Sequence, residues 1–430
     1  MEHNRGNAVV HHNLDDPPAL YINGRFIVQQ VTGVQRVAFE LVGQIDAMMG
    51  RGELAARVVL LVPRGRWVQH LALKHIEVRV IGRSSGLWWE QVELARYVGA
   101  VPLLCLGNTA PVWTLLRRGQ TPTPRAVPQP APMPGSAAVS VMIHDVSYRN
   151  HARAYRLGYR VIHRLMLPLL LRRAQTVITV SHTESGRLQR IEPRVLARTL
   201  VAQNGGWSAS DGSPQQHRHL PADGFALYVG SLSHRKNFDR ILATAIDLAR
   251  DDGIDFVFVG SSGTVLRAPR MDVPADVAHR IHFLGQINDR DLLGRIYAAA
   301  GVLVFPSLYE ASPLPPIEAA HFNCPTVASN IPSMWERCGR NAIYCDPRSV
   351  PSIKRAVRTA LLDPAARAFL VQGLQGLAAG YSWSEQAETI CHHILPGHMT
   401  RLGAGPAAQA DAAIATAVQP PVASGRRAAG

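Results

Sequence analysis

Two glutamates stand eight positions apart in the stretch YEASPLPPIEAAHFNCP, with three prolines between them. A carboxylate only accepts hydrogen bonds, whereas sugar hydroxyls donate them. Glu310 and Glu318 at one mouth would therefore suit a nucleotide-sugar, with one carboxylate on the sugar ring and the other on the ribose. A plainer interpretation is that Glu318 complements a helix dipole and that Glu310 is solvated. The two glutamates alone leave both interpretations open.

The prolines predict where a helix begins. Pro315 and Pro316 have a fixed φ and no N–H, which suits the first turn of a helix. The apolar run Val302 to Ser307 before them is typical of a buried parallel strand. Ligands of open α/β sheets bind beyond the carboxyl ends of such strands. We therefore expect Glu310 in a crevice loop and Glu318 in the first turn of the helix that follows.

A pair of cations favours the ligand-binding interpretation. In GSLSHRKNFDRIL, Arg235 and Lys236 come just before a helix that is expected to open near Asn237. A helix N-terminus attracts phosphate, and two adjacent cations would neutralise a diphosphate. The alternative is an ordinary basic turn. Lysine is rare in this arginine-rich chain, since only Lys74 and Lys354 accompany Lys236, and this makes Lys236 more notable than a random cation.

The elements that must position these side chains alternate along the chain. Short β-branched and apolar runs are followed by stretches of helical period, which predicts α/β domains with doubly wound parallel sheets. In the first half we expect strands at Ala19 to Asn23, Val58 to Pro63, Val101 to Gly107, Ala138 to Asp145, Thr176 to Ser181 and Thr199 to Asn204, and helices at Gly33 to Met49, Trp88 to Tyr97 and Tyr155 to Arg173. In the second half we expect strands at Ala226 to Leu232, Asp255 to Ser261, Ile281 to Ile287, Val302 to Ser307, Pro325 to Ser329 and Ala342 to Asp346.

The length of 430 residues predicts two domains, because one core rarely organises so many. We place the first domain at 18–206 and the second at 225–380. Between them, the segment 207–224 is rich in Ser, Gly, Pro, Gln and His and is the expected linker. We expect disordered tails at 1–17 and 402–430 and an extended proline-rich loop at 121–135.

Composition narrows the function classes. The net charge of +14 favours anionic ligands, but the arginines are scattered and no aromatic and basic recognition motif is present, which argues against nucleic acid. The five cysteines include no C-x-x-C pair, so we expect reduced, mostly buried thiols. No apolar run approaches the roughly 20 residues of a membrane span, and 1–17 is polar with no signal-peptide core. We expect a soluble, cytoplasmic protein.

Several motifs of the second half resemble the nucleotide-sugar-binding domain of retaining glycosyltransferases of family 4, which have the GT-B fold of two Rossmann-like domains facing across a cleft. They are VGSLSHRKNFDRIL, FLGQINDRDLLGRIYAAAGVLVFPSLYEASPLPPIEAA with the E-x(7)-E signature, and CPTVASNIPSMWERCGRNAIYCDP. Segments of the first half that resemble the family more weakly include NGRFIVQQVTGVQRVAFEL, IHDVSY and VITVSHTESGRL. The segment 381–396 looks like the helix that, in such enzymes, crosses back onto the first domain.

The resemblance implies roles for individual residues. Glu310 would bind hydroxyls of the transferred sugar, and Glu318 the ribose. Arg235 and Lys236 would hold the diphosphate and stabilise the charge that develops on it. His144 would line the sugar site. The remaining expected donor contacts are Gly33, Gly230, Gly285, Ser312 and Leu314.

The implied reaction transfers a hexose, with retention, from a nucleotide diphosphate sugar to a saccharide or lipid-linked acceptor in cell-surface polysaccharide synthesis. No cofactor or metal is expected, because Asp289 in the D-x-D sequence DRD reads as a helix cap. GDP-mannose is suggested by the N-G-R and T-G-V-Q-R sequences, with UDP-sugars also open. Ala311 and Pro313 replace the family's usual glycines, which leaves the donor less defined. Ser231 replaces an arginine that many relatives have, which leaves Arg235 to provide that charge.

The segment Arg153 to Ala174 places Arg156, Arg160 and Arg164 at helical spacing beside apolar residues. It either lies on an anionic bilayer, near a lipid-linked acceptor, or is a core helix with a solvated basic face.

Two further functions stay open for the whole chain, a non-catalytic nucleotide-sugar or glycan sensor and a sugar-nucleotide epimerase of the same fold.

Overall fold

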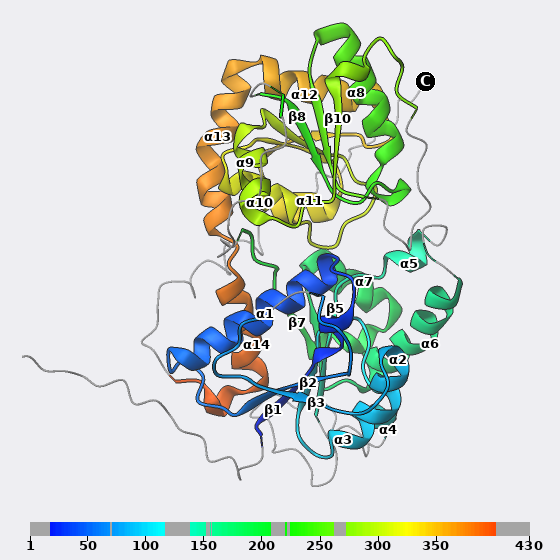
Figure 1. Cartoon of the computed structure of the whole chain (residues 1–430), viewed down its shortest axis with the longest axis vertical. Helices are drawn as coiled ribbons and strands as arrows, with labels where there is room; N and C mark the ends of the chain where they lie inside the picture. The colour runs from blue at the N-terminus through cyan, green and yellow to red at the C-terminus, as the bar shows by residue number, and fades with distance from the viewer. Residues whose placement is uncertain are drawn as a thin grey trace, which may run out of the picture.

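The computed structural model describes residues 18–68, 71–116, 138–151, 155, 157–207, 220–221, 224–261 and 272–400. The two expected tails, the proline-rich loop and Arg156 lie outside the described residues, as does most of the expected linker. Two lobes stand one above the other, each built around a sheet (Figure 1). The domain boundaries given above stay a prediction.

The first lobe holds a parallel sheet in the order β3-β2-β1-β4-β5-β6-β7 within the described residues. Its strands are β1 (Leu20–Asn23), β2 (Val58–Val62), β3 (Glu77–Val80), β4 (Leu103–Cys105), β5 (Val139–Ile143), β6 (Thr176–Thr179) and β7 (Thr199–Val201). Strand β3 was not predicted. It pairs with β2 at the edge of the sheet and its residues alternate between half-buried and exposed, so it lacks the apolar run that marks the other strands.

The second lobe holds the other parallel sheet, in the order β10-β9-β8-β11-β12-β13 among the described strands. Its strands are β8 (Ala226–Val229), β9 (Phe256–Val259), β10 (Ile281–Gly285), β11 (Val302–Phe305), β12 (Thr326–Ser329) and β13 (Ala342–Cys345). All six lie inside predicted runs. The central neighbours β8 and β11 pair at Val302 and Ala226, which brings the loops after them together.

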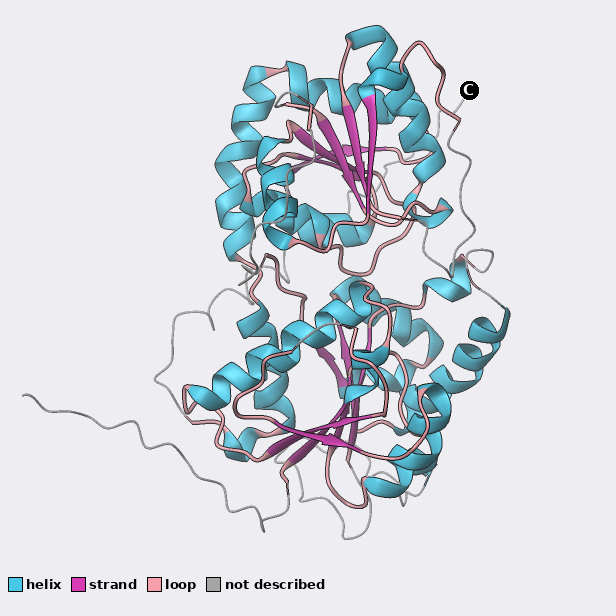
Figure 2. Cartoon of the chain, viewed as in Figure 1, coloured by secondary structure: helices cyan, strands magenta, loops and turns pink. Residues whose placement is uncertain are grey.

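Helices cover both faces of each sheet (Figure 2). In the first lobe they are η1 (Gly24–Val28), α1 (Gly33–Gly50), α2 (Gly86–Trp88), the π-helical η2 (Trp89–Leu94), α3 (Ala95–Tyr97), α4 (Val112–Leu116), α5 (Ser147–Asn150), α6 (Leu157–Arg173), α7 (His182–Ile191) and η4 (Pro193–Arg198). From the second lobe onward they are η5 (His234–Lys236), α8 (Phe238–Asp252), η6 (Ala278–Arg280), α9 (Arg290–Ala299), α10 (Pro315–His321), α11 (Pro332–Cys338), α12 (Val350–Leu362), α13 (Pro364–Ala379), α14 (Trp383–Ile394) and η7 (Pro396–His398).

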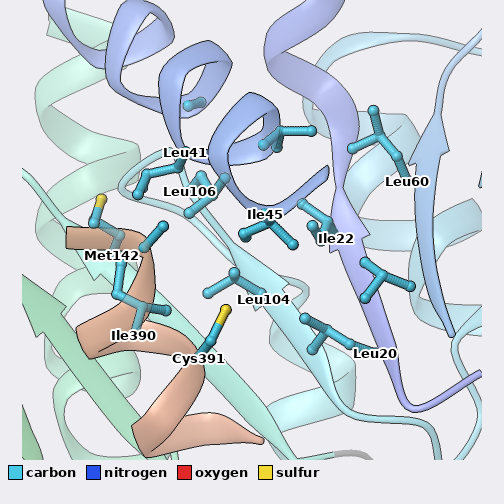
Figure 3. Close-up of a cluster of buried hydrophobic side chains, with 14 of the residues drawn as sticks. Leu20, Ile22, Leu41, Ile45, Leu60, Leu104, Leu106, Met142, Ile390 and Cys391 are labelled. Atoms are coloured by element: carbon cyan, nitrogen blue, oxygen red, sulfur yellow. The ribbon is translucent and has the colours of Figure 1, made fainter. Parts of the chain in front are cut away.

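The crossing helix predicted at 381–396 is confirmed. Helix α14 follows α13 of the second lobe and packs beside α1 of the first (Figure 1). Its apolar side chains Ile390 and Cys391 join the core beneath the first sheet, together with Ile22, Leu104 and Met142 (Figure 3). The chain thus ends its described part in the domain where it began, which ties the two lobes together. The predicted GT-B architecture is confirmed by the two sheets and this crossover.

Helix α6 carries the predicted basic segment. Leu157, Val161 and Leu165 lie four residues apart on it and are 69%, 47% and 74% exposed. Arg164 is exposed beside them, whereas Arg160 is half-buried. Among the helices that the structure describes, none is both long enough and apolar enough to cross a bilayer.

Candidate functional site at the facing ends of the two sheets

The turn between β8 and α8 presents the predicted cations. Asn237 follows Lys236 with a φ of +65°, a left-handed conformation that Asn tolerates better than most residues. Its side-chain amide donates to the carbonyl oxygens of Pro306 at 2.9 Å and Pro347 at 2.6 Å. These bonds fasten the turn to the segments that follow β11 and β13, the first of which leads to Glu310. Helix α8 then begins at Phe238, as the sequence predicted.

Glu310 lies against these cations and is 5% exposed. Lys236 Nζ donates to Glu310 Oε1 at 2.6 Å, and Arg235 Nη1 lies 3.8 Å from Oε2. Arg235 also donates to the carbonyl of Tyr309 at 3.1 Å. Burial lowers the pKa of Lys236 from its usual value, although the Glu310 carboxylate acts in the opposite direction. The structure thus brings these three charged side chains together, and their role in binding a donor stays a prediction.

Glu318 lies apart from this set, in a different environment. Pro315 begins α10 and places Glu318 in its first turn, where it is 1% exposed. Tyr297 of α9 donates its hydroxyl to Glu318 Oε2 at 2.9 Å. Arg36 of α1, in the first lobe, forms an ion pair with the other oxygen. The Nε and Nη2 atoms of Arg36 are buried and have no hydrogen-bond partner among the described residues, which leaves donors next to Glu318 for another acceptor.

His144 follows β5 and is 5% exposed. Its Nε2 lies 2.8 Å from the carbonyl oxygen of Leu106, so this nitrogen donates and Nδ1 is left as an acceptor. The backbone N–H of His144 donates to Asn108 Oδ1 at 2.6 Å. Burial lowers the pKa of His144, which keeps its imidazole neutral.

The other predicted contacts lie on separate elements of the two lobes. Gly33 is the first residue of α1, and Gly230 follows β8. Gly285 ends the edge strand β10 with a φ of +70°, a conformation that favours glycine. Within the part of the chain that the structure describes, the buried hydroxyl of Ser312 has no hydrogen-bond partner. Leu314 packs against the core of the first lobe, so it contributes to the contact between the lobes.

Sequence reasoning missed the residues that join the two lobes here. Arg36 belongs to the motif TGVQR that was noted for Gly33, and this was the one available signal for it. Glu184 and Arg187 of α7 lie in the quoted motif VITVSHTESGRL but had no spacing that pointed to Glu310. Tyr297 carried no signal, because it stands on the helix before β11.

The predicted reading of DRD as a helix start is confirmed. Asp289 is the N-cap of α9, and its carboxylate accepts from the N–H of Leu292 at 3.1 Å. The five cysteines are free and buried, also as predicted.

Comparison with known proteins relates the second half of the chain to a family. The family model described as glycosyl transferases group 1 matches residues 211–373. An O-antigen chain mannosyltransferase B of Escherichia coli is 30% identical over 174 residues, which are 39% of this chain and 45% of the relative. A glycogen synthase of Mycobacterium tuberculosis is 29% identical over 231 residues, 51% of this chain and 53% of the relative. The chain thus spans about half the length of these curated relatives.

The solved structure of a sucrose-phosphate synthase from Thermosynechococcus elongatus covers 87% of this chain and 97% of its own, with a TM-score of 0.61 and 18% identity. At that identity the likeness concerns the fold alone, and it extends over both lobes. Residues 211–373, which include most of the second lobe, match the glycosyl transferases group 1 family, and the chain has the GT-B fold.

Proposed function

We propose that this protein is a retaining, metal-independent glycosyltransferase that moves a hexose from a nucleotide diphosphate sugar to a saccharide or lipid-linked acceptor in cell-surface polysaccharide synthesis. The observation that carries the proposal is the contact of Lys236 with Glu310 at 2.6 Å, at the start of α8. A cation for a diphosphate and a carboxylate for sugar hydroxyls are side by side there. The family match to residues 211–373 supports the same assignment.

The proposed chemistry depends on charge that develops as the glycosidic bond breaks. The departing diphosphate gains negative charge and the sugar becomes oxocarbenium-like, so cations at the leaving group stabilise the transition state more than the ground state. Lys236 and Arg235 are proposed to fill that role. Glu310 would hold hydroxyls of the transferred sugar, and Glu318 would hold the ribose. A bound diphosphate would compete with Glu310 for the ammonium group of Lys236.

The neighbouring groups have proposed roles that follow from their unused hydrogen-bonding capacity. Nδ1 of the neutral His144 would accept a sugar hydroxyl, since Nε2 donates to Leu106. The hydroxyl of Ser312, which has no partner among the residues that the structure describes, would donate to the sugar or phosphate. Backbone groups at Gly33, Gly230 and Gly285, and the contact of Leu314 with the first lobe, would complete the donor site.

For the donor, we propose mannose from GDP-mannose as the first candidate, because a mannosyltransferase is among the matched relatives. The glycogen synthase match keeps glucosyl donors in the comparison. A thermal-shift panel of GDP, UDP and ADP would identify the nucleotide. A ligand at 100 times its Kd should add about 2.7 kcal/mol to the stability. No shift with any nucleotide diphosphate would remove the basis for the proposal.

Product analysis then separates the proposed enzyme from its alternatives. Incubation with the selected donor and a membrane extract should consume donor and yield a glycosylated acceptor whose anomeric configuration, read by NMR, matches that of the donor. An epimerase would convert the nucleotide-sugar without any acceptor. A sensor would bind the donor and release no product.

We also propose that α6 contacts an anionic bilayer on the cytoplasmic side, which would bring the protein to a lipid-linked acceptor. The exposed Leu157, Val161 and Leu165 form an apolar stripe, and the exposed Arg164 adds positive charge next to it. Flotation with anionic vesicles should retain the protein, and neutral vesicles should not. A variant with Arg156, Arg160 and Arg164 neutralised should stay in solution; undiminished flotation of that variant would exclude the role of α6.

A further inference from the structure

Glu184 of α7 connects two loops that belong to different lobes. Its Oε1 accepts from the backbone N–H of Val146 at 2.8 Å, two residues after His144. Both carboxylate oxygens accept from the hydroxyl of Tyr309, at 3.2 and 3.1 Å, one residue before Glu310. The Glu184 side chain is fully buried. One carboxylate therefore fixes the first lobe's His144 loop relative to the second lobe's Glu310 loop.

Arg187, one turn later on α7, reinforces this connection. Its Nη1 donates to Glu184 Oε2 at 2.6 Å and to the backbone carbonyl of Glu310 at 3.0 Å. Its guanidinium also lies over the ring of Tyr309, 4.2 Å from the centroid. The side chain thus contacts the backbone of the very residue whose carboxylate meets Lys236.

The amino end of α7 is held by the second lobe as well. Glu336 of α11 accepts from the backbone N–H groups of His182 at 2.6 Å and Thr183 at 2.8 Å. It also accepts from the Thr183 hydroxyl at 2.6 Å. A residue of one lobe therefore caps a helix of the other. Helices α7 and α11 lie next to each other where the lobes meet (Figure 1).

We propose that Glu184 and Arg187 are positioning residues that set the placement of Glu310 relative to His144 when the two lobes close. The inference rests on the proposed transferase function and adds to it residues that touch neither donor nor acceptor. The physical reason is that transfer requires the sugar and the acceptor hydroxyl in near-attack geometry, and an error of about 1 Å can cost on the order of a hundredfold in rate. A buried carboxylate with three donors, one of them the half-buried guanidinium of Arg187, holds such a geometry better than apolar contacts.

The ionisation of Glu184 supplies a readout that a merely structural role would not. Burial raises the pKa of Glu184 to about 7, with Arg187 and the Tyr309 hydroxyl opposing that shift and Asp145 adding to it. The ionised form accepts from all its donors, whereas protonation converts one acceptor oxygen into a donor. We therefore expect kcat of the wild type to fall as the pH drops through about 7.

The test compares Glu184→Gln, Tyr309→Phe and the double variant with the wild type, using the donor selected above. We expect Glu184→Gln to lower kcat about tenfold, to leave KM for the donor within about twofold, and to lose the pH dependence near 7. Tyr309→Phe keeps the ring and removes the hydroxyl. Since both changes disrupt the same hydrogen bond between Tyr309 and Glu184, kcat of the double variant should fall no further than that of Glu184→Gln alone.

Thr183→Val is the matched control, because it removes a contact between the lobes on the same helix without touching the Glu310 loop. It should keep kcat within about twofold of the wild type. Additive losses, or a pH profile of Glu184→Gln that coincides with that of the wild type, would overturn the inference. If the wild type itself transfers no sugar, the proposed function fails instead, so the two failures are distinguishable. Circular dichroism confirms that each variant is folded.

Discussion

The two glutamates of the E-x(7)-E motif are satisfied in different ways. Glu310 meets Lys236 and Arg235 of its own lobe, and the turn that bears them is fastened to the same sheet. Glu318 meets Tyr297 of its own lobe but takes its cation, Arg36, from the other lobe. One carboxylate is therefore held by the fold of a single domain, and the other is completed only when the lobes are together. Closure should change the surroundings of Glu318 far more than those of the Lys236 contact.

The largest expected effect concerns the link between the lobes next to Glu310. Because the pKa of Glu184 rises from 4.5 to about 7 on folding, the folded protein binds a proton that the unfolded chain releases between these values. The stabilisation is complete below the unfolded pKa and is lost as the pH rises through the folded pKa. The contribution of Glu184 to the free energy of unfolding should thus fall by about 3 kcal/mol as the pH rises from below 4.5 to above about 7. Urea unfolding at several pH values should show that loss in the wild type but not in Glu184→Gln; equal slopes in both would contradict it.

Lys236→Ala removes the cation that contacts Glu310. We expect kcat to fall about a hundredfold, equivalent to about 2.7 kcal/mol, because a cation at the leaving group is lost. The protein should remain folded, since Arg235 still lies near Glu310. Steady-state kinetics with saturating donor measure the effect. Lys354→Ala, which removes a lysine paired with Asp251 on the surface, serves as the control and should retain full turnover.

Arg36→Gln removes the cation that pairs with Glu318. It leaves a buried carboxylate with Tyr297 alone, which should cost about 2 kcal/mol of stability, less than a fully buried pair because the Arg36 side chain is 21% exposed. Urea unfolding measures the loss. Adding Glu318→Gln removes the unpaired charge and should recover part of it. A double variant less stable than Arg36→Gln would show that the ion pair is not the cause.

Glu336→Ala tests the contact between the lobes away from both glutamates. Helix α7 would lose the acceptor for its first two amides, although Ser181 still caps Glu184 N–H at 3.1 Å. We expect a loss of about 1 kcal/mol, as for other helix caps. Thermal unfolding should detect the change. Glu388→Ala, on the exposed face of α14, should leave the midpoint nearly unaltered.

The fold and one half of the site were predictable from the sequence. Alternation of strands and helices marks the sheets, and Lys236 and Glu310 each follow a predicted strand, so their shared edge follows from parallel strands. Strand β3 was not predicted, because an exposed edge strand needs no apolar run. Arg36 and Glu184 could not be assigned, since their partners lie across the interface. Hydrophobic periodicity reports which face of a helix or strand packs against the core of its own domain. It carries no information about which residues of two folded domains contact each other.

The cap that Glu336 places on α7 makes the amino end of that helix a natural reporter. If the lobes part, the amides of His182 and Thr183 would lose the Glu336 carboxylate that accepts from them. Hydrogen exchange at these two positions would then count the openings of the molecule without any attached probe. A donor that draws the lobes together would slow that exchange before any product has formed.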